Sequence, residues 1–135
     1  MRLWDYRLIP VLPNAMLVSQ WRECIAIKRQ WEKGTLKHRL VSYVMDYDKG
    51  YFYDYFHLIR EELEKRNIKY QGRYILEMYN FCEDDFHYEE HYYNYLEHND
   101  RYLKQCYYNL QEKYDRGIIT EEEWKKIENL FKEKI

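Results

Sequence analysis

The chain of 135 residues carries 22 Lys and Arg against 24 Asp and Glu, a formal net charge of −2, and 46% of it is hydrophobic. This composition indicates one folded domain over residues 1–135, and it excludes a uniformly basic nucleic-acid coat and an acidic disordered tail. Four glycines and two prolines are too few for an all-β sandwich, and no apolar run is long enough for a membrane-spanning helix.

The first fifty residues predict an extended start followed by helices. Residues 8–13 contain two prolines and read as an extended lead-in. Asn14 is a suitable N-cap for a helix over about 15–32, which we expect to end near Gly34. Residues 35–47 predict a second, shorter helix.

The middle of the chain predicts a third helix, a loop and a short fourth helix. Residues 51–66 have apolar side chains on one helical stripe, at Phe52, Tyr55, Phe56, Ile59 and Leu63. Residues 67–72 read as a loop, and residues 74–81 predict another helical turn or two.

The last part of the chain predicts a pair of helices. Asn99 or Asp100 caps a helix over 101–115, which ends at Gly117. Thr120 and Glu123 form a capping box that begins the final helix. The expected fold is therefore an all-α, single compact multi-helix domain, with an extended N-terminal segment packed near the first helix.

The three cysteines are Cys24, Cys82 and Cys106. An odd number of widely separated cysteines without a CxxC pair argues against a disulfide framework and a zinc knuckle. We expect reduced, buried thiols in a cytoplasmic protein. Charges at Arg2, Asp5 and Arg7 argue against a secretory signal peptide.

Charge is distributed unevenly along the chain. Residues 1–50 hold nine Lys and Arg against five Asp and Glu, a net charge of +4. Residues 77–100 hold eight acidic side chains and no Lys or Arg, a net charge of −8. Because local potential decides whether a polyanion is attracted, the first segment can form a basic face. The alternative is that these charges are scattered over ordinary solvated surface.

Glu23 has an unusual position on the first predicted helix. At about 100° per residue it lies at the rim of the apolar arc, next to Met16 and Ile27, while Arg22 and Arg29 share the opposite edge. Partial burial of a carboxyl group raises its pKa, which suits proton transfer near neutral pH. The other interpretation is a boundary glutamate paired with a neighbouring cation.

Other constellations are weaker. His87 and His91 have the spacing of two metal ligands on a helix, but Tyr88 stands where zinc proteases have Glu. The segment 97–100 suits a helix cap better than a ligand set. A Gly-rich phosphate loop is missing, so nucleotide hydrolysis is not expected. We predict neither a metal nor a cofactor.

The chain resembles a known enzyme family at Met1-Arg2-Leu3-Trp4 and at Leu17-Val18-Ser19-Gln20-Trp21-Arg22-Glu23-Cys24. These segments are similar to the pyrimidine-dimer DNA glycosylases, also called phage-type endonuclease V. The likeness is greatest to a bacterial branch that opens Met-Arg-Leu-Trp and has a Glu-His-Asn-Asp-like segment before a late helix, here 97–100.

The resemblance implies a DNA repair glycosylase that is also an abasic-site lyase, with the α-amino group of Met1 as nucleophile. Glu23 would handle protons and stabilise the cationic intermediate, and Arg2 and Arg22 would hold phosphates or the sugar. Trp21, Lys28 and Arg29 are predicted to contact the substrate as well. The expected partner is double-stranded damaged DNA, bound by a monomer away from any membrane.

Several residues depart from the family pattern. The family usually exposes a small N-terminal residue before the arginine, whereas Met1 precedes Arg2 here. The phage enzymes have His and Arg where this chain has Met16 and Ala26. The alternative function is therefore a non-catalytic nucleic-acid-binding or structural domain of the same fold, in which the N-terminus lies far from Glu23.

Overall fold

The structure is a computed structural model that describes residues 1–85 and 95–134. Within these ranges it has five α-helices, three short 3-10 helices and no strand. In chain order the elements are η1 (Tyr6–Val11), α1 (Asn14–Lys33), η2 (Ser42–Asp46), α2 (Lys49–Lys65), α3 (Arg73–Cys82), η3 (Glu83–Asp85), α4 (Asp100–Asp115) and α5 (Glu121–Lys134). The predicted all-α fold class is confirmed.

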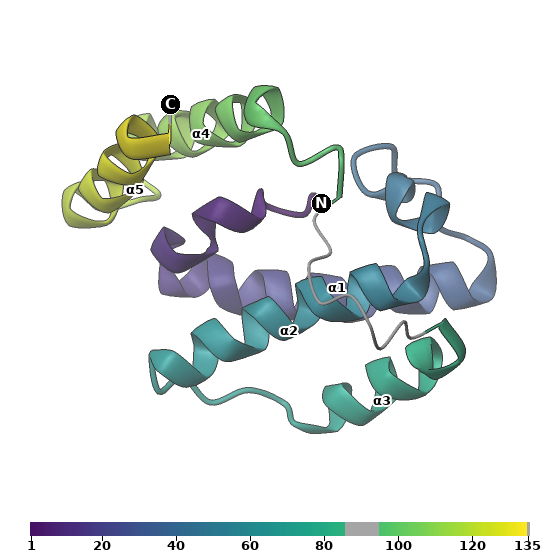
Figure 1. Ribbon diagram of the computed structural model, residues 1–135. Helices are drawn as coiled ribbons and strands as arrows, with labels where there is room; N and C mark the ends of the chain where they lie inside the picture. The colour runs from purple at the N-terminus through teal and green to yellow at the C-terminus, as the bar shows by residue number, and fades with distance from the viewer. Residues whose placement is uncertain (86–94, 135) are drawn as a thin grey trace.

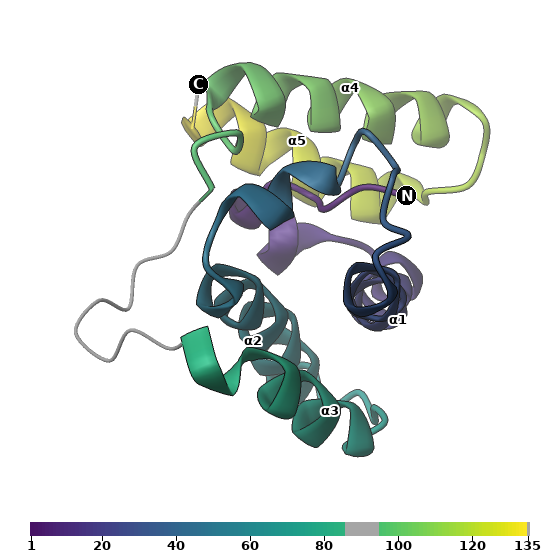
Figure 2. The same cartoon turned by 90° about the vertical axis from the view of Figure 1, so that its right-hand side faces the viewer.

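The helices form two groups, with the N-terminal segment between them (Figure 1). In one group α2 lies alongside α1, and α3 packs against both. In the other, α4 and α5 form an antiparallel pair, and η1 contacts both α5 and α2. Figure 2 shows the first residues running between the α4–α5 pair and α1. The N-terminal segment thus packs near the first helix, as predicted.

The apolar stripes of α1 and α2 meet in the core. The Trp21 ring stacks on the Phe56 ring with a centroid distance of 4.0 Å. Every residue of the stripe predicted on α2 is buried, namely Phe52, Tyr55, Phe56, Ile59 and Leu63. Burying one large apolar side chain stabilises a fold by about 1.5–3 kcal/mol, so this contact fixes how α1 lies on α2. All three cysteines are buried and free, as predicted.

The predicted ends of α1, α4 and α5 are largely confirmed. Gly34 ends α1 in the left-handed region at φ 73°, which glycine adopts without steric cost. The Asn99 side chain accepts a hydrogen bond from the Tyr102 amide and begins α4. Thr120 and Glu123 make the reciprocal bonds of a capping box, at 2.9 and 3.2 Å.

The capping role predicted for Asn14 is wrong. Pro13 is the N-cap of α1, and no side chain caps this end. The Asn14 side-chain oxygen instead accepts a hydrogen bond from the Arg66 guanidinium at 3.0 Å. Arg66 also donates to three backbone carbonyls of the preceding segment, those of Ile9, Pro10 and Leu12.

The extended lead-in predicted for residues 8–13 is also wrong. The chain forms η1 over Tyr6–Val11, with Pro10 inside it. The cause is Asp5, which is fully buried and caps η1 by accepting hydrogen bonds from the Arg7 amide and guanidinium. Two prolines restrict φ but permit a 3-10 turn when a side chain caps its first amides.

The second helix predicted for residues 35–47 is reduced to η2, over Ser42–Asp46. Val41 and Val44 are both fully buried. Because a 3-10 helix has three residues per turn, residues spaced by three lie on one side of it. A short 3-10 turn therefore buries both valines without a longer helix.

Candidate active site at the N-terminus

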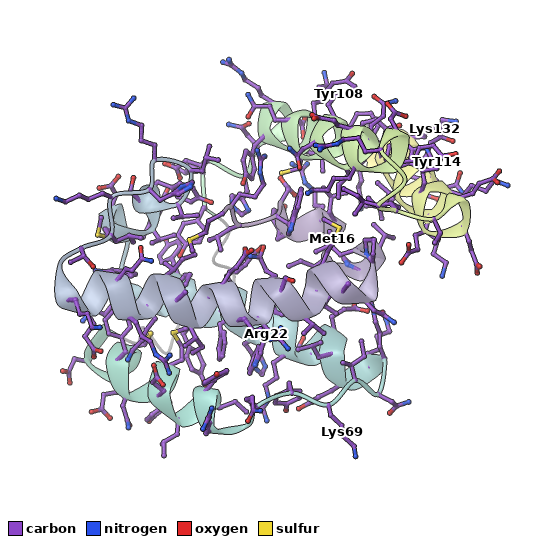
Figure 3. All side chains as sticks on the ribbon, turned by 180° about the vertical axis from the view of Figure 1, so that it is seen from behind. Met16, Arg22, Lys69, Tyr108, Tyr114 and Lys132 are labelled. Atoms are coloured by element: carbon purple, nitrogen blue, oxygen red, sulfur yellow. The ribbon has the colours of Figure 1, made fainter. Side chains whose placement is uncertain are left out.

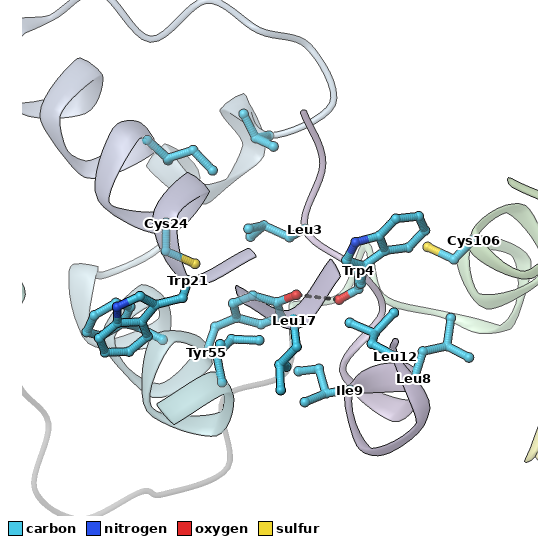
Figure 4. Packing of buried hydrophobic residues seen from close by; sticks show 14 of the residues in the cluster. Leu3, Trp4, Leu8, Ile9, Leu12, Leu17, Trp21, Cys24, Tyr55 and Cys106 are labelled. Atoms are coloured by element: carbon cyan, nitrogen blue, oxygen red, sulfur yellow. Dashed lines mark hydrogen bonds between the residues drawn. The ribbon is translucent and has the colours of Figure 1, made fainter. Parts of the chain in front are cut away.

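The first four residues are held by side chains from separate helices. Gln20 on α1 accepts a hydrogen bond from the Trp4 amide at 2.7 Å and donates one to the Arg2 carbonyl at 3.0 Å. The Tyr55 hydroxyl on α2 donates to the Trp4 carbonyl at 2.6 Å (Figure 4). These bonds fix the backbone of the segment from the side of α1 and α2.

A third helix, α4, holds the same segment from the opposite side. The Tyr102 hydroxyl donates a hydrogen bond to the carbonyl of Leu3, whose side chain is fully buried. The Arg2 guanidinium lies over the Trp4 ring, 5.6 Å from its centroid. Burial raises the pKa of the Cys106 thiol on α4, and the Arg2 charge acts on that pKa in the opposite direction. Arg2 thus extends along the wall formed by α4.

Glu23 lies half-buried beside this anchored segment. One oxygen of its carboxylate accepts a hydrogen bond from the Gln20 side-chain amide at 3.1 Å. Burial raises the pKa of Glu23, while the positive charges of the N-terminal amino group and of Lys113 lower it. No cation in the described ranges forms a salt bridge with Glu23. The site therefore combines a primary amine with a carboxyl group whose pKa is raised by burial.

Arg22 and Trp21 point in other directions from α1. Arg22 is exposed and lines two adjoining hollows of about 290 and 490 Å³. Lys69 lines the smaller hollow, and Figure 3 shows Arg22 on the side of α1 that faces this lysine. Trp21 is only 2% exposed and belongs to the core, although its ring borders the smaller hollow.

Lys28 and Arg29 are bound to α3. The Lys28 ammonium is 2.9 Å from Glu32 and 3.2 Å from Glu77. The Arg29 guanidinium donates two hydrogen bonds to the Glu77 carboxylate, at 2.9 and 3.0 Å. The hydrogen bond from Arg29, followed by that from Lys28, lowers the pKa of Glu77. The structure therefore gathers Met1, Arg2 and Glu23 at one site, and holds Lys28 and Arg29 against α3.

A comparison with protein families identifies the family of the chain. The family model for pyrimidine dimer DNA glycosylase matches residues 1–76, more than half of the chain. The chain belongs to this family. Neither the curated proteins nor the solved structures compared with the chain give a match. Membership supports a DNA glycosylase function in general, with DNA as the substrate.

The stretch that the family model matches contains most of the site. It covers α1 and α2, which carry Gln20, Glu23 and Tyr55, and it ends inside α3. Tyr102 and Lys113 lie beyond it, on α4. The C-terminal helices therefore supply a tyrosine that anchors the N-terminal segment and a cation that acts on Glu23.

Sequence reasoning missed three residues that shape the candidate site. Gln20 and Tyr55 lie on predicted helices, and a glutamine on the apolar stripe of the first helix was the signal available in the sequence. Lys113 left no local signal, because it reaches Glu23 only through the packing of α4 against the N-terminal segment. The alternative that Glu23 pairs with a neighbouring side-chain cation has no salt bridge among the described residues to support it.

Two further predictions concern metals and membranes. The described residues of the chain contain no group of three or more His, Cys, Asp or Glu side chains arranged to hold a metal. His87 and His91, the pair considered from the sequence, lie outside the described residues. Across residues 1–85 and 95–134, no helix is both long and apolar enough to cross a membrane.

Proposed function

We propose that the chain is a DNA glycosylase and abasic-site lyase that uses the α-amino group of Met1 as its nucleophile and Glu23 as its proton-handling group. One observation carries the proposal. Glu23 is half-buried and paired with no side-chain cation within the described residues, yet the charge of the N-terminal amino group acts directly on its pKa. An amine and a carboxyl group so arranged suit Schiff-base chemistry at the sugar of a nucleotide.

The proposed reaction begins with the uncharged amine. Its nitrogen attacks C1′ of the damaged nucleotide, and the C1′–N bond to the base breaks. The base leaves with the electron pair and takes up a proton, while the attacking nitrogen loses one. Breaking of the C1′–O4′ bond, with protonation of O4′, then gives the iminium ion.

Strand cleavage follows from this iminium ion. A base removes a proton from C2′, a C2′=C3′ double bond forms, and the C3′–O bond breaks with release of the phosphate group. Water then hydrolyses the iminium ion, which frees the amine of Met1 and the sugar aldehyde. Each covalent step needs only water as a further reactant.

Glu23 serves two of these steps. Burial raises its pKa, which favours the protonated form that donates to the departing base or to O4′. Once ionised, the same carboxylate lies where it stabilises the positive iminium ion and accepts the C2′ proton. A carboxyl group that keeps both forms accessible suits this pair of roles.

The cations are proposed to bind the DNA backbone. Arg22 is exposed beside Lys69 on another side of α1, and Lys113 on α4 is close enough to act on the pKa of Glu23, so cations are available to phosphates on either side of α1. Arg2, over the Trp4 ring, is proposed to contact the sugar or its phosphate. Lys28, Arg29 and Trp21 remain predicted substrate contacts, although Glu77 holds the first two and the core holds the third.

Borohydride trapping tests the proposal. Untagged protein is incubated with an abasic-site duplex and sodium borohydride, which reduces an iminium ion to a stable secondary amine. We expect a covalent protein–DNA band that disappears when the protein is first acetylated at its N-terminus. Folded, unblocked protein that gives no band would favour the alternative, a non-catalytic DNA-binding domain of the same fold. Ultraviolet-irradiated duplex then tests pyrimidine dimers as the lesion.

A further inference from the structure

Gln20 is the most completely bonded polar side chain near the site. It is fully buried in α1, and its amide nitrogen donates to the Arg2 carbonyl at 3.0 Å and to Glu23 at 3.1 Å. Its amide oxygen accepts from the Trp4 amide at 2.7 Å and lies 2.9 Å from the Tyr55 hydroxyl, which shares its single hydrogen between this oxygen and the Trp4 carbonyl. A side-chain amide has two donor hydrogens, and Gln20 uses both.

The partners also fix which way the amide faces. The Trp4 amide can only donate, so it requires the oxygen of Gln20. The Arg2 carbonyl can only accept, so it requires the nitrogen. The opposite orientation would set two donors against each other at Trp4 and two acceptors at Arg2. The direction of the amide hydrogen that reaches Glu23 is therefore set by the N-terminal backbone.

This arrangement makes Gln20 a physical link between the two proposed reacting groups. One amide nitrogen holds the carbonyl of the second residue and the carboxylate of Glu23 at the same time. The α-amino group is one residue upstream of that carbonyl. Any shift of the N-terminal segment relative to Glu23 must therefore break a hydrogen bond of the fully buried Gln20 side chain, and such breaks are costly.

We propose that Gln20 is a positioning residue that holds the α-amino group of Met1 in register with the Glu23 carboxylate. This inference rests on the proposed function, because it assigns Gln20 to the same reaction. Gln20 itself touches neither the substrate nor the reacting atoms. It acts through the backbone of Arg2 and through the orientation of Glu23.

The first test replaces Gln20 with a side chain of similar size that forms none of these bonds, in Gln20→Met. Gln30→Met is the matched control, because residue 30 is the same type on the same helix and lies outside the site. Both proteins are assayed by single-turnover borohydride trapping across pH. We expect Gln20→Met to trap about a hundredfold more slowly than wild type, since small misplacements of reacting groups have effects of this size. Gln30→Met should trap at the wild-type rate.

A second readout needs no DNA. The rate of acetylation of the N-terminal amine is measured by mass spectrometry at one fixed pH. In wild type, Glu23→Gln removes the carboxylate that Gln20 holds near the N-terminal segment and should change this rate. In the Gln20→Met background the same substitution should change the rate by a smaller factor. An equal change in both backgrounds would overturn the positioning role.

Tyr55→Phe provides a milder variant in case Gln20→Met does not fold. It removes the hydroxyl that supports Trp4 and Gln20 but leaves every bond to Arg2 and Glu23 in place. We expect about a tenfold slower trapping rate, in the same direction as Gln20→Met. A wild-type rate in either folded variant would contradict the inference. If wild type itself does not trap, the proposed function fails, and the acetylation measurement alone then decides whether Gln20 couples the amine to Glu23.

Discussion

Two glutamates in contact with the same helix have opposite electrostatic environments. Glu77, on α3, accepts hydrogen bonds from Arg29 and Lys28, and these bonds lower its pKa. Glu23, on α1 itself, accepts from the neutral amide of Gln20, and burial raises its pKa. The charged form of the same side chain is therefore favoured at one position and disfavoured at the other.

The difference separates a structural charge from a reactive one. At Glu77 the carboxylate joins α1 to α3, and the positive charges of Lys28 and Arg29 neutralise it in that contact. At Glu23 no side-chain cation forms a salt bridge among the described residues, and the charges of the N-terminal amine and Lys113 offset only part of the effect of burial. Uncompensated burial of an ionisable group costs stability, and functional sites are where such groups concentrate.

The largest expected effect is on catalysis by Glu23→Gln. We expect the single-turnover rate of base release and strand cleavage to fall about 10²–10⁴-fold, the usual contribution of a positioned acid–base group. Denaturing electrophoresis of an end-labelled abasic-site duplex measures the rate. Glu77→Gln is the matched control and should cleave at the wild-type rate. Equal losses of cleavage rate in the two variants would show that Glu23 has no catalytic role that Glu77 lacks.

His98 must be taken into account before the glutamates are compared at acid pH. It is 5% exposed, its Nε2 lies 2.6 Å from the Tyr43 hydroxyl, and burial lowers its pKa to about 4. The unfolded chain binds a proton below about pH 6.5, whereas the folded chain resists it until about pH 4. Stability should therefore fall by about 3 kcal/mol as the pH drops through this range.

Urea unfolding at a series of pH values measures this loss. His98→Gln should be less stable than wild type at pH 7 and show a flatter dependence between pH 6.5 and 4. A variant with the full wild-type slope would mean that other groups cause the acid sensitivity.

Glu77→Gln should destabilise the fold by about 1–2 kcal/mol, because Lys28 is buried and loses one of its two carboxylate partners. The lowered pKa of Glu77 gives the sign of the pH dependence. Its contribution is fully present above the unfolded value of 4.5 and is lost as the pH falls through the lower folded value. Thermal unfolding at pH 7 and at pH 3 should show the difference between variant and wild type shrinking at the lower pH.

Arg22→Ala should weaken DNA binding by about 1 kcal/mol and reduce the slope of log affinity against log salt by about 0.9, the effect of one phosphate contact. Arg29→Ala is the contrasting variant, since Glu77 already neutralises its charge. It should change the slope less than Arg22→Ala does. Fluorescence anisotropy with an abasic-site duplex at several salt concentrations tests the pair, and the reverse order would show that Arg29 leaves Glu77 to bind DNA.

The smallest expected effect is a gain in stability from Glu23→Gln. The neutral amide can still accept the hydrogen bond from Gln20, and it avoids burying a charge. We expect about 0.5 kcal/mol of added stability at pH 8. Because the pKa of Glu23 is raised, the gain should appear as the pH rises through that value and vanish below pH 4.5. A loss of stability at pH 8 would show that the carboxylate is better compensated than the structure indicates.

Local sequence signals predicted the helices and their ends well. Thr120 and Glu123 sit three residues apart and can satisfy each other's amides without help from the rest of the fold. The capping prediction for Asn14 failed because its side-chain oxygen accepts a hydrogen bond from Arg66, which is distant in the sequence and which no local pattern reveals. The extended structure predicted for residues 8–13 failed for a related reason, since these residues continue η1, whose cap is the buried Asp5.

The site could be predicted only in part. The wheel of α1 places Glu23 at the rim of the apolar arc, and the structure shows the expected raised pKa. The same wheel leaves Lys28 as an intruder on that arc, and only the packing of α3 shows that Glu77 is its partner. Gln20 could not be assigned from sequence, because its four partners come from the N-terminal backbone, α1 and α2.

The central claim is that the amine of Met1, and not a lysine, forms the covalent bond to DNA. The most direct measurement is to trap untagged protein on an abasic-site duplex with borohydride, digest both components and locate the adduct by tandem mass spectrometry. The account predicts one modified peptide, beginning at Met1 and carrying the sugar on its α-nitrogen. An adduct on the side chain of Lys113 or Lys69, with an unmodified N-terminal peptide, would contradict it.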